Sequence, residues 1–216
     1  MIRGLVFDFD GLISDTESAL IDAYGEIHAR HGVAFDRKLF LRSVGHADYS
    51  FDPWHAFEKR ADRAALELER RACNLELDAT LPLLPGVLPL LDAARAAELP
   101  VAVASNSRHD HVEGHLKRLG IRDRFSVIGC REDVPSPKPE PDLYRYVVNH
   151  LGIFPREAIA FEDSRTGSLA AKRAHLWTVA VPNASTAHHD FSHVDWQVSS
   201  LLACPLPALL ARFDRP

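Results

Sequence analysis

The sequence predicts an α/β protein: a core parallel sheet with helices on both faces, and a small all-helical unit inserted near the N-terminus. Two observations support this prediction. From residue 101 onward, short apolar runs alternate with amphipathic stretches, which is typical of parallel strands joined by crossover helices. Residues 36–80 instead show helical periodicity with almost no strand signal.

The first elements are a strand and a helix. Residues 2–7 form an apolar run of the length of a buried strand. Ser14 and Glu17 then have the spacing of a capping box, with Ser14 as the N-cap of a helix that ends near Gly32. One apolar face of this helix is expected to hold Leu20, Ala23, Tyr24 and Ile27.

Proline and glycine at residues 84–87 mark the return of the chain to the core. We expect the core to comprise residues 1–14 and 83–216, and the helical unit residues 15–82. The expected strands are 101–105, 125–129, 158–162 and 177–181. The expected helices are one closed by Gly120, one over 140–151 closed by Gly152, one ending at His175 and one over 201–213.

Composition restricts the function classes only coarsely. The 216 residues carry a formal net charge of −5 and no cluster of Lys and Arg, which argues against general binding of nucleic acid or anionic membranes. No apolar run is long enough to span a bilayer. We expect a cytoplasmic monomer that acts on a small molecule. Its three cysteines, Cys73, Cys130 and Cys204, are expected to be reduced and without a role.

Asp8 and Asp10 follow the first strand and stand two positions apart, with Gly11 directly after them. The backbone turns at the end of a strand, so both carboxylates can face one crevice, and glycine lets the backbone approach a ligand closely. Two crowded acids favour a bound cation or a shared proton. Two chance aspartates in a solvated loop would be an equally simple explanation of this motif alone.

Three later segments also place polar residues next to strands or helices. Ser105 and Asn106 end one apolar run, Lys138 lies between prolines ahead of a helix, and Glu162 and Asp163 end another run. Taken singly, the lysine could be an exposed charge, the serine a helix N-cap, and the two acids partners of a helix dipole. Because these segments follow the two aspartates in this order along the chain, one shared site explains all of them more simply than a separate role for each.

The segments FDFDGLISDTE, VAVASNS, SPKPEPD and AFEDSRTGSLAAKRA together resemble the four motifs of the haloacid dehalogenase-like hydrolase superfamily. The resemblance runs from residue 2 to about residue 183. It is strongest to the phosphatase and beta-phosphoglucomutase branch, in which a helical cap domain is inserted after the first motif into a Rossmann-like core.

The resemblance implies magnesium-dependent cleavage of a phosphate ester. Asp8 would be the nucleophile that forms an aspartyl-phosphate, and Asp10 the general acid and then the base. Ser105 and Lys138 would bind and neutralise the phosphoryl oxygens. The resemblance implies that Mg²⁺ is bound by an oxygen-rich set of ligands: Asp8, Asp10, Glu162 and Asp163. Of the last two, Asp163 would be the more direct ligand.

The remaining candidate residues contact substrate or phosphate: Gly11, Glu17, His46, Asn106, together with Ser105 and Lys138. His46 belongs to the cap loop at residues 45–48, which in related proteins faces the catalytic site. Mutases of this branch have a sequence similar to G-x-S-R in this loop, and its arginine holds a second phosphate. This chain has Asp48 in place of that arginine. A cationic replacement would have to come from Lys59 or Arg60, on a later stretch of the cap.

An acid at that position disfavours a bisphosphate intermediate, so we favour a phosphatase for a small phosphorylated metabolite such as a sugar phosphate. A beta-phosphoglucomutase-like phosphosugar mutase is the alternative, and a non-catalytic binding protein on the same fold is a third. Dehalogenation is disfavoured because that branch lacks the second aspartate, which is present here as Asp10.

Five of the twelve histidines form two clusters in the sequence. His111 and His115 lie four positions apart, and His188, His189 and His193 form the second group. Metal ligation would require a carboxylate or a third nitrogen ligand in an HExxH-like context, which is absent, so we expect both clusters to be solvated surface. His175 stands where relatives usually have glycine after a helix, which leaves that helix end open.

Overall fold

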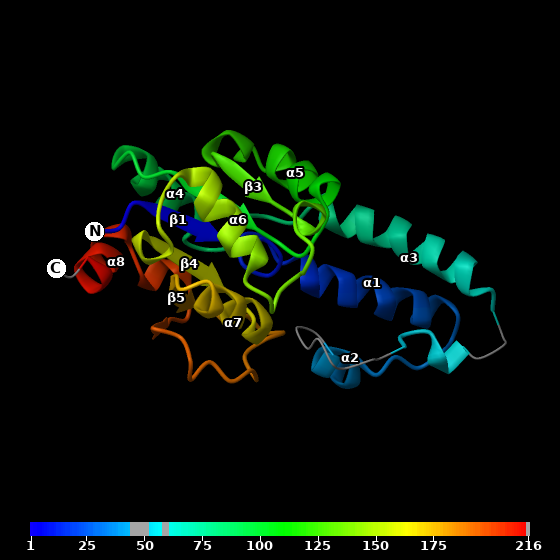
Figure 1. Ribbon diagram of the computed structural model, residues 1–216. Coiled ribbons are helices and arrows are strands. Elements are labelled where there is room, and N and C mark those ends of the chain that lie inside the picture. Colours follow the sequence, from blue (N-terminus) through cyan, green and yellow to red (C-terminus); the bar gives the residue numbers. More distant parts are fainter. Residues whose placement is uncertain (44–51, 58–60, 215–216) are drawn as a thin grey trace.

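The computed structural model describes residues 1–43, 52–57 and 61–214, and a six-stranded sheet forms the centre of its core (Figure 1). The strands stand in the order β3-β2-β1-β4-β5-β6, and all five pairings are parallel. Their bounds are β1 Gly4–Phe7, β2 Val101–Ala104, β3 Val127–Gly129, β4 Ala158–Glu162, β5 Trp177–Ala180 and β6 Trp196–Gln197. The predicted parallel sheet is therefore confirmed.

The register of the sheet brings the polar strand ends together. Phe7 of β1 pairs with Val103 of β2 on one side and with Phe161 of β4 on the other. The Asp8 N–H continues the ladder by donating to the Phe161 carbonyl oxygen at 3.0 Å. Residues that follow these positions therefore emerge at one edge of the sheet, as expected for the carboxyl ends of parallel strands.

Helices cover both faces of the sheet because successive strand side chains point to opposite sides. Leu5 and Phe7 pack with α4 (Val87–Ala96), α5 (His109–Arg118) and α8 (Leu206–Phe213). Val6, between them, faces the other side. There the alanines of β2 and β4 pack with α6 (Asp142–Leu151) and α7 (Arg165–Arg173). The sheet is therefore the middle of three layers.

The predicted all-helical cap is also confirmed. It contains α1 (Thr16–Arg30), α2 (Arg37–Ser43) and α3 (Arg63–Asp78), and in Figure 1 α1 and α3 extend side by side away from the core. The cap has an apolar cluster of its own, separate from both clusters of the sheet: Ala23, Ile27, Trp54, Phe57, Leu66 and Cys73.

The prediction that Ser14 caps α1 is wrong. The N-cap is Asp15, whose side chain accepts a hydrogen bond from the Ser18 N–H at 3.2 Å. Ser14 is fully buried, and its Oγ donates to the Pro82 carbonyl oxygen at 3.1 Å instead. Nearby, the Leu84 N–H donates to the Ile13 carbonyl oxygen at 2.9 Å. Ser14 therefore joins the two segments that connect cap and core.

Several element ends differ from the prediction. The last predicted helix, 201–213, is a 3₁₀ turn over Leu201–Ala203 followed by α8, because Pro205 begins a new helix and cannot continue the old one. Helix α4 and the short β6 were not predicted. The remaining 3₁₀ turns are His55–Phe57, Arg122–Arg124, Arg131–Asp133 and Pro155–Glu157.

Helix α7 ends at Arg173, two residues before the predicted end at His175, and the residue at position 175 is unusual. His175 has a φ of 68° and follows the C-cap residue Ala174, so a histidine holds the left-handed position that glycine normally takes. The three cysteines are free, as predicted, and all three are buried. None of the helices in the described residues is long and apolar enough to cross a membrane.

Candidate active site

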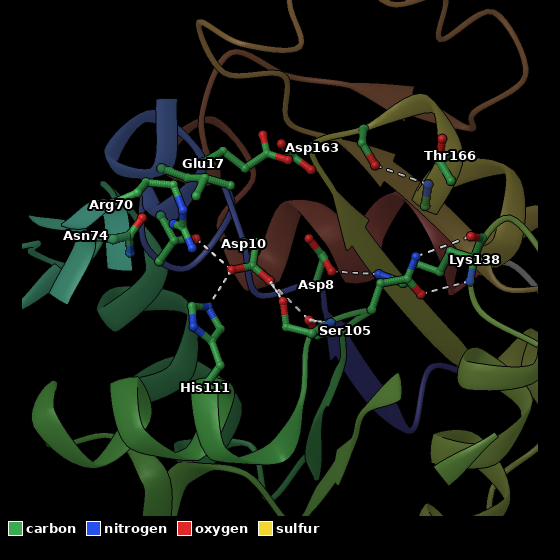
Figure 2. A pocket seen from close by; sticks show the side chains of 16 residues that line it. Asp8, Asp10, Glu17, Arg70, Asn74, Ser105, His111, Lys138, Asp163 and Thr166 are labelled. Carbon is green, nitrogen blue, oxygen red and sulfur yellow. Dashed lines mark hydrogen bonds and ion pairs between the residues drawn. The ribbon is translucent and has the colours of Figure 1, made fainter. Parts of the chain in front are cut away.

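The predicted catalytic residues lie together at the carboxyl edge of the sheet (Figure 2). Asp8 follows β1, Ser105 follows β2, Asp163 follows β4, and Lys138 belongs to the loop that leads into α6. They line a cavity of about 510 Å³ whose other wall is formed by residues of the cap helices α1 and α3. The order of the strands in the sheet thus brings together residues that are more than 150 positions apart in the sequence.

Lys138 forms the centre of a buried ion-pair network. Its Nζ donates to Asp8 Oδ1 at 2.6 Å and to Glu162 Oε1 at 2.6 Å. Burial opposes the charge of Lys138, but these two carboxylates outweigh burial and raise the pKa of the ammonium group above its ordinary value. The alternative that Lys138 is an exposed loop charge is excluded, since only 6% of the residue is exposed.

Asn106 holds this lysine in place. The Lys138 N–H donates to Asn106 Oδ1 at 2.8 Å, and Asn106 Nδ2 donates back to the Lys138 carbonyl oxygen at 3.2 Å. Both ends of the Asn106 side chain are therefore engaged by backbone. Its predicted contact with phosphate stays a prediction.

Asp8, Glu162 and Asp163 form a compact group of acids. Their candidate ligand oxygens lie within 4.8 Å of one another, and all three residues are buried. Burial, followed by the Glu162 and Asp10 charges, raises the pKa of Asp8 to about 8 against the effect of Lys138. Burial likewise raises the pKa of Asp163 well above its ordinary value. One ammonium group cannot balance three carboxylates, so the group is short of positive charge.

This donor set fits a hard divalent cation, which binds oxygen ligands. Glu162 accepts hydrogen bonds on both of its oxygens, from Lys138 and the Tyr144 hydroxyl on Oε1 and from Ser164 on Oε2. Asp8 and Asp163 have fewer hydrogen bonds and are therefore better placed for direct ligation. Asn183 holds Asp163 in place, because its Nδ2 donates to Asp163 Oδ2 at 2.7 Å.

Gly11 is required by the close packing next to Asp163. Its φ is 77°, and a Cβ atom added to it would lie 2.5 Å from both Asp163 Oδ2 and Asn183 Nδ2. Its carbonyl oxygen accepts a hydrogen bond from Asn183 at 3.0 Å. A side chain at this position would displace the very carboxylate that is predicted to bind metal.

Asp10 lies apart from the acid group and is surrounded by donors. Thr16 Oγ1 and His111 Nε2 contact Oδ1 at 2.7 and 2.8 Å, and Ser107 and Ser105 contact Oδ2 at 2.6 and 3.2 Å. Burial alone would raise the pKa of Asp10, but the hydrogen bonds outweigh burial and hold it well below its ordinary value. These donors already engage both oxygens of Asp10. The predicted contact of the Asp10 side chain with the metal stays a prediction.

The prediction that His111 and His115 are solvated surface is wrong. His111 lines the cavity, and His115 is 8% exposed. In the second cluster His189 is also buried, and His193 Nε2 lies 3.0 Å from Ser168 Oγ. Only His188 is exposed as predicted. Local spacing could not reveal these positions, because the partners of both clusters come from distant segments.

The cap contributes a polar roof to the cavity. Glu17 from α1 and Asn74 and Arg70 from α3 line it, and Glu17 Oε2 and Asn74 Oδ1 are buried and accept no hydrogen bond from the described part of the chain. Burial, followed by the charges of Asp10 and Asp8, raises the pKa of Glu17 to about 8. The predicted His46 lies outside the described residues, as do Asp48, Lys59 and Arg60.

Besides Arg70 and Asn74 of the cap, the contributors to the site that were not predicted include Thr16, Ser107, His111, Tyr144 and Asn183. Ser107 and His111 follow Ser105 within two turns, so a search of the helix after each strand end would have found them. Tyr144 stands within the apolar face of α6 and Asn183 in the loop after β5. No sequence pattern distinguishes those two from core and loop residues.

Comparison with known proteins agrees with this geometry. The family model for haloacid dehalogenase-like hydrolases matches residues 2–175. YhcW of Bacillus subtilis, which carries the name of a phosphatase, is 37% identical over 97% of each chain. Hexitol phosphatase B of Escherichia coli is 31% identical over 93% of each chain.

A solved structure is similar over nearly the same length. CbbY from Rhodobacter sphaeroides in complex with xylulose-1,5-bisphosphate has a TM-score of 0.77 and 28% identity, covering 97% of this chain and 99% of that one. A beta-phosphoglucomutase from Clostridium difficile shares the fold, with a TM-score of 0.77 and 21% identity over 99% and 98% of the two chains. This chain therefore belongs to the haloacid dehalogenase-like hydrolases and is a phosphoric monoester hydrolase.

Proposed function

We propose that this protein is a magnesium-dependent phosphatase that hydrolyses a small phosphorylated metabolite, a sugar phosphate or similar polyol phosphate, through an aspartyl-phosphate on Asp8. The observation that carries the proposal is the position of Asp8. Its carboxylate lies at the base of the cavity, 2.6 Å from Lys138 Nζ and within the acid group formed with Glu162 and Asp163.

Asp8 and Asp163 would hold the magnesium ion, with Glu162 supporting them through Lys138. When bound, Mg²⁺ supplies positive charge that offsets the repulsion between the carboxylates and the phosphate dianion. The small ion and its oxygen preference suit this set of acids better than zinc, which prefers nitrogen and sulfur ligands.

The residues of the chain account for two displacement steps. An oxygen of Asp8 attacks phosphorus, the ester P–O bond breaks, and Asp10 gives its proton to the leaving oxygen. Lys138 and Ser105 stabilise the phosphoryl oxygens as charge develops. Asp10 then accepts a proton from water, which attacks the same phosphorus and releases inorganic phosphate and free Asp8.

Asp10 must be protonated before the first step, although its donors favour the ionised form. A phosphate dianion that enters the cavity brings negative charge close to Asp10, and like charge raises the pKa of a carboxyl group. We expect the substrate itself to promote the acid form of Asp10.

The roof of the cavity favours a substrate rich in hydroxyl groups. Glu17 Oε2 and Asn74 Oδ1 are buried polar atoms without a hydrogen-bond partner among the described residues, and a buried unpaired polar atom costs about 1–3 kcal/mol. Hydroxyl groups of a polyol or sugar would satisfy both. Hexitol phosphatase B and CbbY with its bound xylulose bisphosphate are relatives whose names fit the same substrate class.

One cap cation bears on the mutase alternative. Arg70 lines the cavity, where it could face a second phosphate. However, its Nε and Nη2 donate to the two oxygens of Glu67 at 3.1 and 2.7 Å, and this carboxylate offsets its charge. We therefore retain hydrolysis as the proposed reaction.

The proposal is tested by phosphate release from a panel of sugar and polyol monophosphates with Mg²⁺ present. We expect turnover of at least one class, and a loss of several orders of magnitude in Asp8→Asn with the fold retained, because the nucleophile is removed. If Asp8→Asn keeps more than about a hundredth of the activity, covalent catalysis by Asp8 is excluded.

A second assay separates phosphatase from mutase. With beta-glucose 1-phosphate and catalytic glucose 1,6-bisphosphate, we expect inorganic phosphate and glucose, if this substrate is accepted. Faster accumulation of glucose 6-phosphate would establish the mutase instead. The cytoplasmic location and monomeric state remain predictions.

A further inference from the structure

His111 is a rigid donor on a carboxylate whose other donors are hydroxyl groups. It lies on α5, the helix that follows the Ser105 segment, and its Nε2 is 2.8 Å from Asp10 Oδ1 (Figure 2). Thr16, Ser105 and Ser107 supply the three hydroxyls around the same carboxylate. A hydroxyl rotates to suit its partners, whereas an imidazole N–H points in one direction fixed by the ring.

Substrate binding would weaken part of this arrangement. Ser105 is proposed to contact a phosphoryl oxygen, and its bond to Asp10 Oδ2, at 3.2 Å, is the longest of the four. The bond from His111 to Oδ1 involves no group proposed to bind phosphate. It can therefore persist through the catalytic cycle and keep the direction of the carboxylate.

The His111 ring is itself held by two aromatic neighbours. Phe9 meets it edge-on, with ring centroids 5.7 Å apart at 90°. The His115 ring lies one helical turn further along α5, with centroids 4.6 Å apart. The rings of Phe9 and His115 thus restrict the position of His111.

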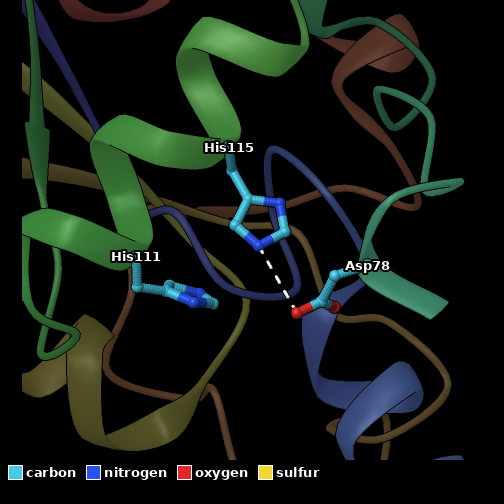
Figure 3. A group of neighbouring side chains, drawn as sticks. All are labelled: Asp78, His111 and His115. Carbon is cyan, nitrogen blue, oxygen red and sulfur yellow. Dashed lines mark ion pairs between the residues drawn. The ribbon is translucent and has the colours of Figure 1, made fainter. Parts of the chain in front are cut away.

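His115 is tied in turn to the cap (Figure 3). Its Nε2 lies 3.5 Å from Oδ2 of Asp78, the last residue of α3, and Arg118 lies 3.3 Å from its Nδ1. Arg118 also donates to the carbonyl oxygens of Ala79 and Leu81, at 3.4 and 2.9 Å. Helix α5 therefore contacts Asp10 at one end and the exit of the cap at the other.

A metal ion bound by Asp78, His111 and His115 is the competing explanation of this group, because their candidate ligand atoms lie within 4.8 Å of one another. Two contacts oppose it. The guanidinium of Arg118 stands beside His115 Nδ1 and repels a cation, and His111 Nε2 is already bonded to Asp10. Hydrogen bonding explains the arrangement without these conflicts.

We propose that His111 is a positioning residue for Asp10: its Nε2–H holds the carboxyl group in the direction needed for proton transfer to the leaving oxygen. The inference rests on the proposed function, since the acid role of Asp10 is itself proposed. His111 contacts neither Asp8 nor Asp163, the two residues proposed to hold the metal, and no group proposed to bind phosphate. Its effect is exerted only through Asp10.

The test compares leaving groups. An alkyl phosphate must receive a proton as its P–O bond breaks, whereas 4-nitrophenyl phosphate loses a stable phenolate without one. For His111→Asn, whose amide is too short to reach Asp10, we expect kcat/KM to fall about 10- to 100-fold on the alkyl phosphate. This is less than the roughly 10²- to 10⁴-fold that general acid catalysis contributes, because Asp10 itself remains. On the aryl phosphate we expect a fall of less than about threefold.

Two variants control the experiment. His111→Gln places an amide nitrogen near the position of Nε2 and should recover kcat/KM on the alkyl phosphate to within about fivefold of the original protein. His109→Gln changes a histidine of the same helix that contacts Asp133 instead, with Nε2 2.7 Å from its Oδ2. It should match the original protein on both substrates.

Equal losses on both substrates, or Gln no better than Asn, would overturn the positioning role. So would full activity in His111→Asn. Thermal unfolding of each variant accompanies the assay, and if His111→Asn does not fold, the alkyl-to-aryl ratio of His111→Gln against His111→Met decides by the same criterion. Asp8→Asn separates the two proposals: if it remains active the proposed function fails, and if it is inactive while His111→Asn is normal only this inference fails.

Discussion

At the scale of single residues, the buried charges dominate the energetics of the site. Lys138 is 6% exposed and contacts two carboxylates that are as deeply buried. Such a network is sensitive to removal of one partner, because the remaining charges stay in a medium of low dielectric constant. Exposed ion pairs elsewhere on the surface lack this sensitivity.

Lys138→Met should therefore destabilise the protein as well as inactivate it. We expect the free energy of unfolding to fall by about 3 kcal/mol, because Asp8 and Glu162 lose their shared partner. Urea denaturation measures this change. The control is Lys172→Met, which breaks the partly exposed pair with Asp195 and should cost about 1 kcal/mol or less. Equal losses in the two variants would contradict the account of the buried network.

Gly11→Ala tests the close packing beside Asp163. The added Cβ would lie 2.5 Å from Asp163 Oδ2, so we expect activity to fall by about 100-fold through displacement of this carboxylate. Gly32→Ala is matched to it, with a φ of 64° and nothing within 4 Å of the added Cβ. That control should lose about 1 kcal/mol of stability through its backbone conformation and keep its activity. A steady-state assay with urea denaturation of both variants distinguishes the two effects.

At the scale of elements, the sequence was most informative where an apolar run ends in a polar residue. The strands and the helix ends at Gly120 and Gly152 follow from periodicity and glycine positions, which are local properties. Helix α4 was missed because the Pro and Gly before it indicate only a linker. The N-cap at Ser14 failed for a different reason: Pro82, the partner that engages Ser14, lies 68 residues away.

The same limit applies to the site. Asp8, Ser105, Lys138 and Asp163 could be predicted because each stands at a strand end or in a short motif. His111 was not predicted, although it stands in the helix that follows Ser105, because its partner Asp10 lies 101 residues earlier in the chain. The two histidine predictions failed because spacing along one helix says nothing about the segment that packs against it.

The end of α7 gives a prediction at this scale. His175 has a φ of 68°, which costs a residue with a side chain about 1–2 kcal/mol. Part of this cost is offset because histidine has less conformational entropy than glycine in the unfolded state. We expect His175→Gly to raise the free energy of unfolding by about 0.5–1 kcal/mol with activity unchanged. The reciprocal change, Gly152→His after α6, should lower it by a similar amount, since Gly152 has the same φ. Thermal or urea unfolding of the pair gives the answer, and destabilisation by His175→Gly would contradict it.

At the scale of the whole molecule, the excess of buried acids links stability to metal binding. A ligand that binds only the folded state stabilises it by about 2.7 kcal/mol at 100 times its dissociation constant. Three buried carboxylates with one lysine should gain in this way from a divalent cation.

We therefore expect saturating Mg²⁺ to raise the Tm by about 5–10 °C and chelation to abolish turnover reversibly. Ca²⁺ should raise the Tm but fail to support turnover, because its longer and looser coordination misplaces the phosphoryl group. Asp163→Asn should lose most of the shift. Full activity after exhaustive chelation would remove the metal from the reaction.

The bond from Ser14 Oγ to the Pro82 carbonyl oxygen has an evolutionary consequence. The chain leaves the core and returns to it at neighbouring points, and the described residues between them, 15–43, 52–57 and 61–81, form a side branch that contributes no strand to the sheet. A recombination event that exchanged this branch for another with similarly close ends would leave Asp8, Lys138 and Asp163 where they are. Descendants of one ancestral enzyme could thus acquire new substrates by trading a single gene segment, while the chemistry at the sheet edge is inherited unchanged.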